Sequence, residues 1–201
     1  LELSKIEDAA RRLKGKLPEP LAWSPNYFDL AGCRIHLKFE NLQYTASFKE
    51  RGACNKLRLL TEEERARGVI AMSAGNHAQG VAYHAQRMGI HAEIVMPRFT
   101  PMVTVDRTRA GAEVVLYGAL LEEARSHAVE LATLRGLTFV HPFDDADVIA
   151  GQATVALEML DEVPDLDTLV VAVGGGGLIG GIAAAAKAIQ PRVALSKSSP
   201  D

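Results

Sequence analysis

The stretch TLVVAVGGGGLIGGIAAAAKAI, residues 168–189, predicts a strand, a tight turn and a helix in immediate succession. Residues 168–173 form the apolar strand, four glycines form the turn, and the alanine-rich residues 177–189 favour a helix. A strand that runs directly into a helix is the repeating unit of α/β folds.

The same alternation continues towards the amino end. Strands are predicted at residues 68–72, 91–96, 113–117 and 137–140, and helices at 76–88, 101–109, 120–135 and 148–160. This rhythm implies an α/β protein with mostly parallel sheets covered by helices.

Further elements are predicted before this repeat. Helical spacing of apolar residues predicts a helix over residues 4–14, and alternation predicts a strand over 34–40. Ser47 is expected to cap a helix that runs to about residue 60, and Thr61 with Glu64 is expected to form a capping box.

The carboxyl end is expected to be truncated. Residues 191–195 could begin another strand, but the polar residues 196–201 stop it. A crossover helix normally leads to a further parallel strand, so the large sheet is expected to be incomplete.

Composition narrows the class of protein. The 201 residues are 48% hydrophobic and carry a formal net charge of −3, which predicts a sizeable core and argues against nucleic acid as a partner. No apolar run approaches the roughly 20 residues that span a bilayer, so no membrane partner is expected. Cys33 and Cys54 fit neither a metal site nor a dense disulfide framework, which indicates a cytoplasmic protein.

The glycine turn, Gly174 to Gly177, is predicted to bind an anion. Exposed amides at a helix start attract negative charge, and glycine lets a phosphate approach closely. A turn with no ligand is the alternative. Residues 175–180 also match G-x-G-x-x-G, but the acidic residue of a nicotinamide site is absent about 20 positions later, so an oxidoreductase is less favoured.

A second turn, residues 73–80, also joins a strand to a helix. Its small residues expose amides that could hold a carboxylate, and an ordinary helix cap explains them equally well. His77 is expected to cap or pack rather than act as a base. His84 and His91 are expected to have no ligand partners, so no metal site is predicted.

Lys49 draws its interest from these two turns. A nucleophilic lysine must be neutral, which requires burial or a nearby cation. Phe48 could supply apolar surface and Arg51 the cation. The alternative is an ordinary solvated lysine, and Glu50, Arg51 and Lys56 are predicted to form a solvated helix face.

Four segments in this order carry a family resemblance: residues 38–41 with 44–57, then 73–80, 142–158 and 173–181. They resemble the fold-type II pyridoxal-phosphate enzymes, with their tryptophan synthase β-like fold. Among these the chain is most similar to threonine dehydratases (threonine ammonia-lyases). The resemblance implies two open, twisted, mostly parallel sheets with the cofactor in the cleft between them.

The resemblance also assigns residues. Lys49 would hold pyridoxal 5'-phosphate through a Schiff base and then remove the substrate's α-proton. Phe48 would pack beside the cofactor and Asn76 would bond the ring hydroxyl. The phosphate would lie on Gly174, Gly175, Gly176, Gly177 and Leu178, and the substrate carboxylate on Ser73, Ala74, Gly75, Asn76 and His77.

The implied reaction is β-elimination of L-threonine, or of L-serine, to 2-oxobutanoate, or pyruvate, and ammonia. Serine racemases place a serine where Ala74 stands, and a polar residue where Phe143 stands, so racemisation is disfavoured. The other alternative is a truncated, non-catalytic fragment that binds the cofactor or a phosphate.

The resemblance further implies a domain division. Residues 1–66 and 146–201 would form the large cofactor-binding domain, incomplete at its carboxyl end, and residues 67–145 a small inserted domain. The part that faces the pyridine nitrogen would lie beyond this sequence. A homodimer or homotetramer, a cytoplasmic location and a role in isoleucine biosynthesis are expected by the same analogy.

Overall fold

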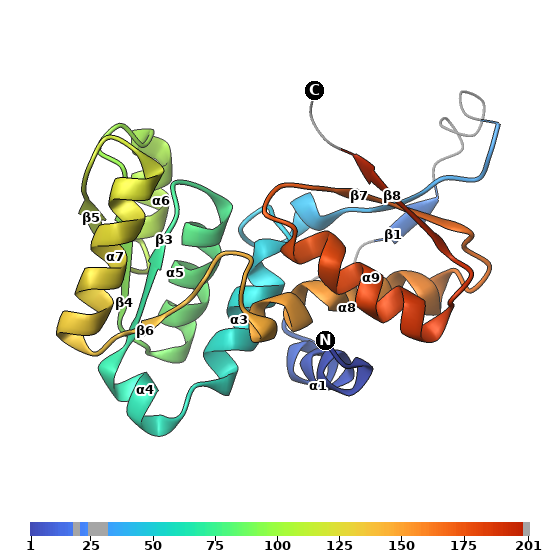
Figure 1. The fold of residues 1–201 in the computed structure, drawn as a ribbon, viewed down its shortest axis with the longest axis horizontal. Coiled ribbons are helices and arrows are strands. Elements are labelled where there is room, and N and C mark those ends of the chain that lie inside the picture. The colour runs from blue at the N-terminus through green and yellow to red at the C-terminus, as the bar shows by residue number, and fades with distance from the viewer. Residues whose placement is uncertain (18–20, 24–31, 199–201) are drawn as a thin grey trace.

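The computed structural model describes residues 1–17, 21–23 and 32–198. The predicted polar stop over residues 196–201 is wrong for residues 196–198, which continue a strand, and residues 199–201 lie outside the described residues. Helices and strands alternate along most of the chain, so the predicted α/β class is confirmed (Figure 1). Within the described residues, none of the helices is long and apolar enough to span a membrane.

A four-stranded parallel sheet occupies the middle of the chain. Its strands are β3 (Val69–Met72), β4 (Ala92–Met96), β5 (Glu113–Leu116) and β6 (Thr138–Phe139), in the order β5-β4-β3-β6. The chain moves outward from β3 to β5 and then returns to pair β6 on the other side of β3. The carboxyl ends of β3 and β6 therefore flank the point where strand order reverses, which is where α/β sheets bind ligands.

Helices cover both faces of this sheet. On one face, Ala71 and Ile94 pack with Ala78 and Val81 of α5 (Asn76–Met88) and with Val105 of α6 (Met102–Arg109). On the other face, the alternate strand residues pack against α7 (Leu121–Arg135). Figure 1 shows α5 and α7 on opposite sides of the strands. The central strands β3 and β4 are buried on both faces, as expected for a parallel sheet, whereas the edge strands β5 and β6 are only partly buried.

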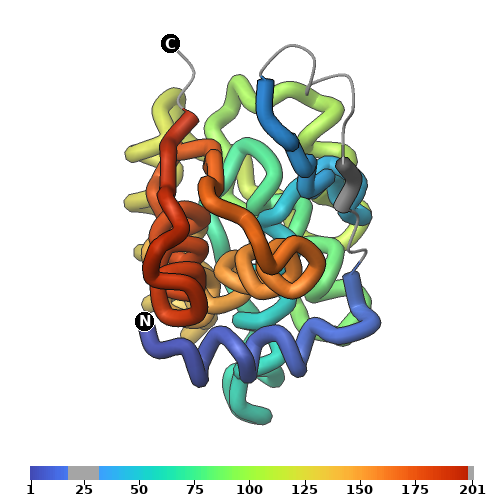
Figure 2. The backbone as a smooth tube through the Cα atoms, turned by 90° about the vertical axis from the view of Figure 1, so that its right-hand side faces the viewer, coloured from blue at the N-terminus to red at the C-terminus, as the bar shows by residue number. Residues whose placement is uncertain are grey.

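The second half of the fold combines the two ends of the chain. α8 (Ala146–Glu162) packs against α9 (Gly177–Ile189) and against α1 (Leu3–Leu13), which lies beneath it in Figure 2. β7 (Thr168–Ala172) pairs in parallel with β8 (Ala194–Ser198), which is the strand predicted to begin near residue 191. β7 alternates between buried and exposed residues, and Val170 is 69% exposed, because helices cover one face of this two-stranded sheet.

The segment before the central sheet follows its prediction in part. β1 (Leu21–Trp23) and β2 (His36–Lys38) form an antiparallel pair, and Glu40 already belongs to the short 3-10 helix η1 (Glu40–Leu42). The predicted strand over residues 34–40 is therefore shorter than expected. α4 (Glu62–Arg67) begins with the predicted capping box of Thr61 and Glu64.

Close helix crossings fix the position of α3 (Lys49–Leu59). A Cβ atom at Gly52 would lie 2.7 Å from the Val148 carbonyl oxygen, and one at Gly151 would lie 2.5 Å from the Arg51 carbonyl oxygen. Glycine at both positions lets α3 and α8 approach at backbone distance. The amino end of α3, which carries Lys49, is therefore held rigidly against α8.

The predicted solvated face of α3 is wrong. Glu50 and Arg51 are buried, and the Lys56 side chain is 18% exposed and pairs with Asp145 at 2.8 Å. Arg51 donates to Glu40 at 2.7 and 2.8 Å and to Glu158 at 2.7 Å. Burial of the Arg51 and Lys56 charges is offset because carboxylates from α8 or the loop before it pair with each of them.

The division into residues 1–66 with 146–201 and residues 67–145 stays a prediction. Figure 1 shows β3 to β6 with their helices grouped on one side, and β1, β7, β8, α8 and α9 on the other. Helix α3 lies between the two groups. Its position places the residues that begin α3 next to loops from both.

Candidate functional site

The Lys49 amine lies at the start of α3 and points at a loop far away in sequence. Its Nζ donates a hydrogen bond to the Pro142 carbonyl oxygen at 2.6 Å and lies 5.3 Å from the centre of the Phe48 ring. Burial lowers the pKa of Lys49. The predicted help from Arg51 is wrong, because the guanidinium is engaged by Glu40 and Glu158. A neutral lysine is thus favoured by desolvation alone.

The helix that carries Lys49 begins slightly later than predicted. The capping position is occupied by Phe48, and Ser47 contributes its hydroxyl oxygen as an acceptor for the Lys49 amide at 3.3 Å. Phe48 therefore stands beside the amine by virtue of the helix start itself. The predicted neighbour Phe48 is thus in contact with the lysine.

The second turn lies at the carboxyl end of β3. The Ser73 hydroxyl oxygen accepts the Gly75 amide at 3.2 Å, and α5 begins at Asn76 with no side-chain cap. The first bond within α5 runs from the Gln79 amide to the Gly75 carbonyl oxygen. The amides of residues 76–78 therefore have no acceptor within the helix, and they form a site suited to a carboxylate. Ala74 lies inside this turn, and its methyl group carries no exchangeable proton.

His77 packs beneath this turn, as predicted. Its side chain is buried, and Nε2 donates to the Val140 carbonyl oxygen at 3.0 Å. Burial is the main reason that the pKa of His77 falls to about 4. A neutral, buried imidazole that holds the end of β6 is a structural residue and not a base. Asn76, in contrast, has an exposed side chain without a hydrogen-bond partner among the described residues.

The glycine turn lies at the start of α9. Gly176 has φ of +89°, and the first bond within the helix runs from the Gly180 amide to the Gly176 carbonyl oxygen at 2.9 Å. The amides of Gly177 and Leu178 are therefore free of helical acceptors. A Cβ atom at Gly175 would lie 2.3 Å from the Phe143 ring. Glycine is required here by backbone conformation at one position and by close packing at another.

One loop connects the lysine with the glycine turn. Pro142 accepts the Lys49 hydrogen bond, and the next residue, Phe143, packs on the turn through its ring and its carbonyl oxygen. The turn of residues 73–77 reaches the same region, because His77 bonds Val140 just before the loop. The structure thus gathers Lys49 and both predicted turns around residues 140–143.

Two contributors to this site were missed by sequence reasoning. The Pro142 carbonyl oxygen and the His141 ring follow directly after β6, next to the reversal in strand order. A signal was present, since parallel strands end at a common edge and His-Pro-Phe follows a predicted strand. What sequence reasoning lacked was the strand order, which makes β6 the neighbour of β3.

These residues fit pyridoxal phosphate as a ligand. The phosphate requires free amides and a close backbone approach, which the turn of Gly174 to Gly177 provides. The aldehyde requires an amine that can lose its proton, which the buried Lys49 provides. The ring can lie beside Phe48. Lys49, the glycine turn and the loop between them meet all three requirements within one region.

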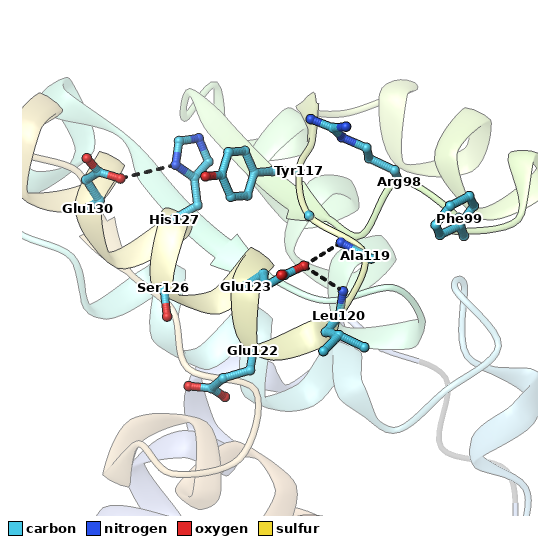
Figure 3. Close-up of a pocket in the computed structure, with 11 residues that line it drawn as sticks. Arg98, Phe99, Tyr117, Ala119, Leu120, Glu122, Glu123, Ser126, His127 and Glu130 are labelled. Carbon is cyan, nitrogen blue, oxygen red and sulfur yellow. Dashed lines mark hydrogen bonds and ion pairs between the residues drawn. The ribbon is translucent and has the colours of Figure 1, made fainter.

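A separate open pocket of about 860 Å³ lies past the ends of β4 and β5 (Figure 3). One of its carboxylates is already engaged: the Glu123 carboxylate accepts the amides of Ala119 and Leu120 at 2.6 and 3.1 Å. His127 stacks on Tyr117 and faces Glu130. Because Glu122, Glu123 and Glu130 line this pocket, it is a poor match for a phosphate.

His91 is closer to other potential metal ligands than predicted. Ligand atoms of His91, Glu93 and Glu113 lie within 4.8 Å of one another, since Glu93 and Glu113 are register partners on neighbouring strands. The buried Glu93 carboxylate is also paired with Arg135 at 2.6 Å. The arginine already neutralises this carboxylate, so the cluster is an ion-pair network as it stands.

Comparisons with known proteins agree with this geometry. The family model described as "Pyridoxal-phosphate dependent enzyme" matches residues 13–200. An L-threonine ammonia-lyase from Thermotoga maritima is 50% identical over 195 residues, which are 96% of this chain and 49% of that protein. The chain spans about half the length of the curated relatives it matches.

Solved structures give the same picture. A threonine deaminase isoform from Solanum lycopersicum is 40% identical with a TM-score of 0.93, covering 98% of this chain and 55% of its own. A serine racemase from Dictyostelium discoideum is 36% identical with a TM-score of 0.95, covering 100% of this chain and 66% of its own. The predicted α/β fold with parallel sheets covered by helices and the family resemblance are confirmed, whereas the described strands form three sheets rather than the expected two.

Proposed function

Because this chain belongs to the family of pyridoxal-phosphate dependent enzymes, we propose that it is the part of a threonine ammonia-lyase that carries the catalytic lysine. The reaction is β-elimination of L-threonine, with L-serine as the alternative substrate, to a 2-oxo acid and ammonia. Relatives named for this activity at 50% identity support the proposal.

One observation carries it. The Lys49 amine is desolvated, fixed at 2.6 Å from the Pro142 carbonyl oxygen, and reached by a loop that packs on the glycine turn. A solvated lysine on a helix face would have neither the burial nor the partner. The amine, the phosphate site and the carboxylate site are therefore parts of one arrangement.

Backbone amides of the two turns serve binding, and Lys49 serves proton transfer. Pyridoxal phosphate, when bound, supplies an electron sink that makes the α-proton of an amino acid removable. The amides of Gly177 and Leu178 would hold the phosphate, and the free amides at the start of α5 would orient the substrate carboxylate. The Lys49 amine would hold the cofactor aldehyde and, as a free amine, would accept the α-proton.

Two residues favour elimination over racemisation. Racemisation requires a proton donor on the face opposite Lys49, and the Ala74 methyl group has no proton to give. Phe143 places an apolar ring against the glycine turn. A chiral assay that finds D-serine produced faster than pyruvate from L-serine would overturn this assignment.

Lysine attachment is tested by reduction with borohydride in the presence of pyridoxal phosphate. Intact mass and peptide mapping are expected to show one adduct at Lys49, and Lys49→Ala is expected to lose it. Lys187, an exposed lysine on α9, provides the matched control, because Lys187→Ala should leave the adduct intact. An adduct distributed over surface lysines would contradict the assignment.

A second candidate function is binding of the cofactor without turnover, motivated by the half-length match to the relatives. Release of 2-oxobutanoate from L-threonine separates the two. An adduct at Lys49 with no 2-oxo acid identifies a non-catalytic cofactor-binding fragment, whereas an adduct with turnover identifies the lyase.

The finer assignments form part of the same proposal. A homodimer or homotetramer, a cytoplasmic location and a place in isoleucine biosynthesis follow the analogy with the named relatives. The division into residues 1–66 with 146–201 and residues 67–145 does so too. Sedimentation of the protein tests the assembly, and limited proteolysis that cuts near residues 66 and 146 tests the domain division.

A further inference from the structure

The loop that follows β6 is organised by one imidazole. The Nδ1 atom of His141 accepts the backbone amides of Phe143 at 3.3 Å and of Asp144 at 2.8 Å. The ring packs edge-on against Phe143, with ring centres 4.8 Å apart, and lies 6.1 Å from Phe139. A single acceptor therefore closes the turn formed by residues 141–144.

Two residues of this turn contact the candidate site. The Pro142 carbonyl oxygen accepts the Lys49 hydrogen bond, and Phe143 occupies the space above Gly175 and Gly177. The turn is anchored separately at its far end, where Asp145 caps α8 and pairs with Lys56. His77 and Lys49 also bond carbonyl oxygens of this segment, but His141 is the side chain within the described turn that closes it on itself.

We propose that His141 is a positioning residue for Lys49 and for the phosphate turn. Its neutral imidazole, protonated at Nε2, fixes the Pro142 carbonyl oxygen and the Phe143 ring through Nδ1. The role of this turn in catalysis rests on the proposed function above, whereas the hydrogen bonds themselves do not.

Charge state decides whether the turn is held. An imidazole that is protonated on both nitrogens has no acceptor left, so both amide bonds are lost. Burial is the main influence that lowers the pKa of His141; Asp144 and Asp145 oppose it, and Arg125 and Lys49 reinforce it. The neutral form therefore prevails at neutral pH, and the turn loosens on acidification below the ordinary histidine range.

An asparagine can reproduce the acceptor. The Oδ1 atom of asparagine stands at the same number of bonds from the backbone as Nδ1, and such side chains commonly accept amides two and three residues ahead. His141→Asn therefore keeps the turn without a titrating group. His141→Leu removes the acceptor at similar bulk, and His127→Leu, at a half-buried histidine of α7 that stacks on Tyr117, is the matched control.

The hydrogen bonds are tested first in the protein without cofactor. Long-range nitrogen–proton NMR of the imidazoles is expected to show Nδ1 of His141 unprotonated at about pH 7.5, one unit above the ordinary histidine pKa. Protection of the Phe143 and Asp144 amides from exchange, relative to their intrinsic rates at each pH, is expected to fall as His141 titrates and to be lower at every pH in His141→Leu. A proton on Nδ1, or exchange that ignores the titration, overturns the proposal whatever the protein's activity is.

The second measurement is the affinity for pyridoxal phosphate. At the same neutral pH, His141→Leu is expected to weaken binding about tenfold or more, while His141→Asn and His127→Leu stay within about threefold of the original protein. The affinity of the original protein for pyridoxal phosphate should fall on acidification. The affinity of His141→Asn should not show the part of this fall that comes from titration of His141. Equal losses of affinity in His141→Leu and His141→Asn would overturn the positioning role.

These outcomes separate two failures. If no variant binds the cofactor, the proposed function fails while the NMR result still decides whether His141 holds the turn. If His141→Leu does not fold, His141→Asn and the titration of the original protein remain decisive.

Discussion

Ala46, three residues before Lys49, adopts a conformation that alanine normally avoids. Its φ is +57°, and it is the one non-glycine residue with positive φ among those the structure describes. Neighbouring contacts hold it there: the Ala46 amide donates to the Gln43 carbonyl oxygen at 2.8 Å, and the buried Glu50 carboxylate accepts the Thr45 amide. The approach to Lys49 is therefore a strained turn closed by a buried carboxylate.

Ala46→Gly is expected to stabilise the protein. Removing the methyl group relieves a left-handed strain of about 1–2 kcal/mol, while glycine adds freedom to the unfolded chain, so a net gain of about 0.5–1 kcal/mol remains. Urea unfolding measures it. The same change at the exposed helical residue Ala188 should lower stability by about 1 kcal/mol, and equal signs at the two positions would contradict the argument.

His77 makes stability depend on acidity. Its pKa is about 4 in the folded protein and 6.5 as an ordinary histidine, so the unfolded chain binds the proton more readily between these values. Stability is thus fully present above about pH 6.5 and falls as the pH drops to 4, by about 3 kcal/mol from this residue.

The pH effect is measured by urea unfolding at about pH 7 and about pH 4, on either side of this window. His77→Gln keeps an amide donor for the Val140 carbonyl oxygen but cannot titrate. On acidification, the original protein should lose about 3 kcal/mol more free energy of unfolding than His77→Gln does. A difference that is independent of pH would show that the imidazole is not buried in its neutral form.

Helices α3 and α8 cross at two glycines, Gly52 and Gly151, so their backbones are in direct contact. A Cβ atom at Gly151 would lie 2.5 Å from the Arg51 carbonyl oxygen and 2.7 Å from Gly52 Cα, both of them backbone atoms that cannot rotate away. The crossing holds the start of α3 in place, so helix packing and the position of Lys49 depend on the same contact.

Gly151→Ala is expected to destabilise the protein by about 1–3 kcal/mol through overpacking. At Gly180, in α9, an added Cβ atom would meet no neighbouring atom within 4 Å, so Gly180→Ala should raise stability by about 0.5–1 kcal/mol. Thermal unfolding of both variants measures the contrast. Stabilisation by both would show that the helices separate easily.

Elements with local signals were predicted well. The bounds of α5 and α9 agree with their predicted residues because each helix begins at a glycine-containing turn and ends where its apolar pattern stops. The strand at residues 34–40 was predicted too long, since Glu40 leaves the sheet to reach Arg51. A contact from another part of the chain ended that strand, and no local pattern contains it.

A buried ionic network joins distant parts of the molecule. Arg51 of α3 contacts Glu40 of η1 and Glu158 of α8, and Glu158 also pairs with Lys38 of β2 at 2.7 Å. The carboxylates outweigh the cost of burial and raise the pKa of Arg51. This network was missed from the sequence because charges in a helical pattern were assigned to solvent, and their partners lie up to 107 residues away.

Arg51→Leu is expected to lower the free energy of unfolding by about 3–5 kcal/mol, because Glu40 and Glu158 lose the cation between them. Arg34 pairs with Asp165 on the exposed surface, so Arg34→Gln should change stability by less than about 1 kcal/mol. Chemical denaturation compares the two. Similar small effects would mean that water reaches the Arg51 network.

The candidate site was predicted in its local pieces and not in its assembly. The glycine turn is visible as a local motif, whereas Lys49 gains its interest in the sequence from the two turns that accompany it. Their common neighbour, the Pro142 carbonyl oxygen, is a backbone atom with no pattern of its own. Its position follows from the order of the strands, which requires the complete fold.

The bond from Lys49 to Pro142 spans 93 residues and has a consequence for how the protein matures. Contacts between distant residues form late in folding, because the long intervening loop must close first. An intermediate with folded helices would therefore still hold Lys49 in water, fully charged and slow to react with an aldehyde. The rate at which the refolding protein binds pyridoxal phosphate would then report the last folding step. This step would follow the recovery of the helical circular dichroism signal.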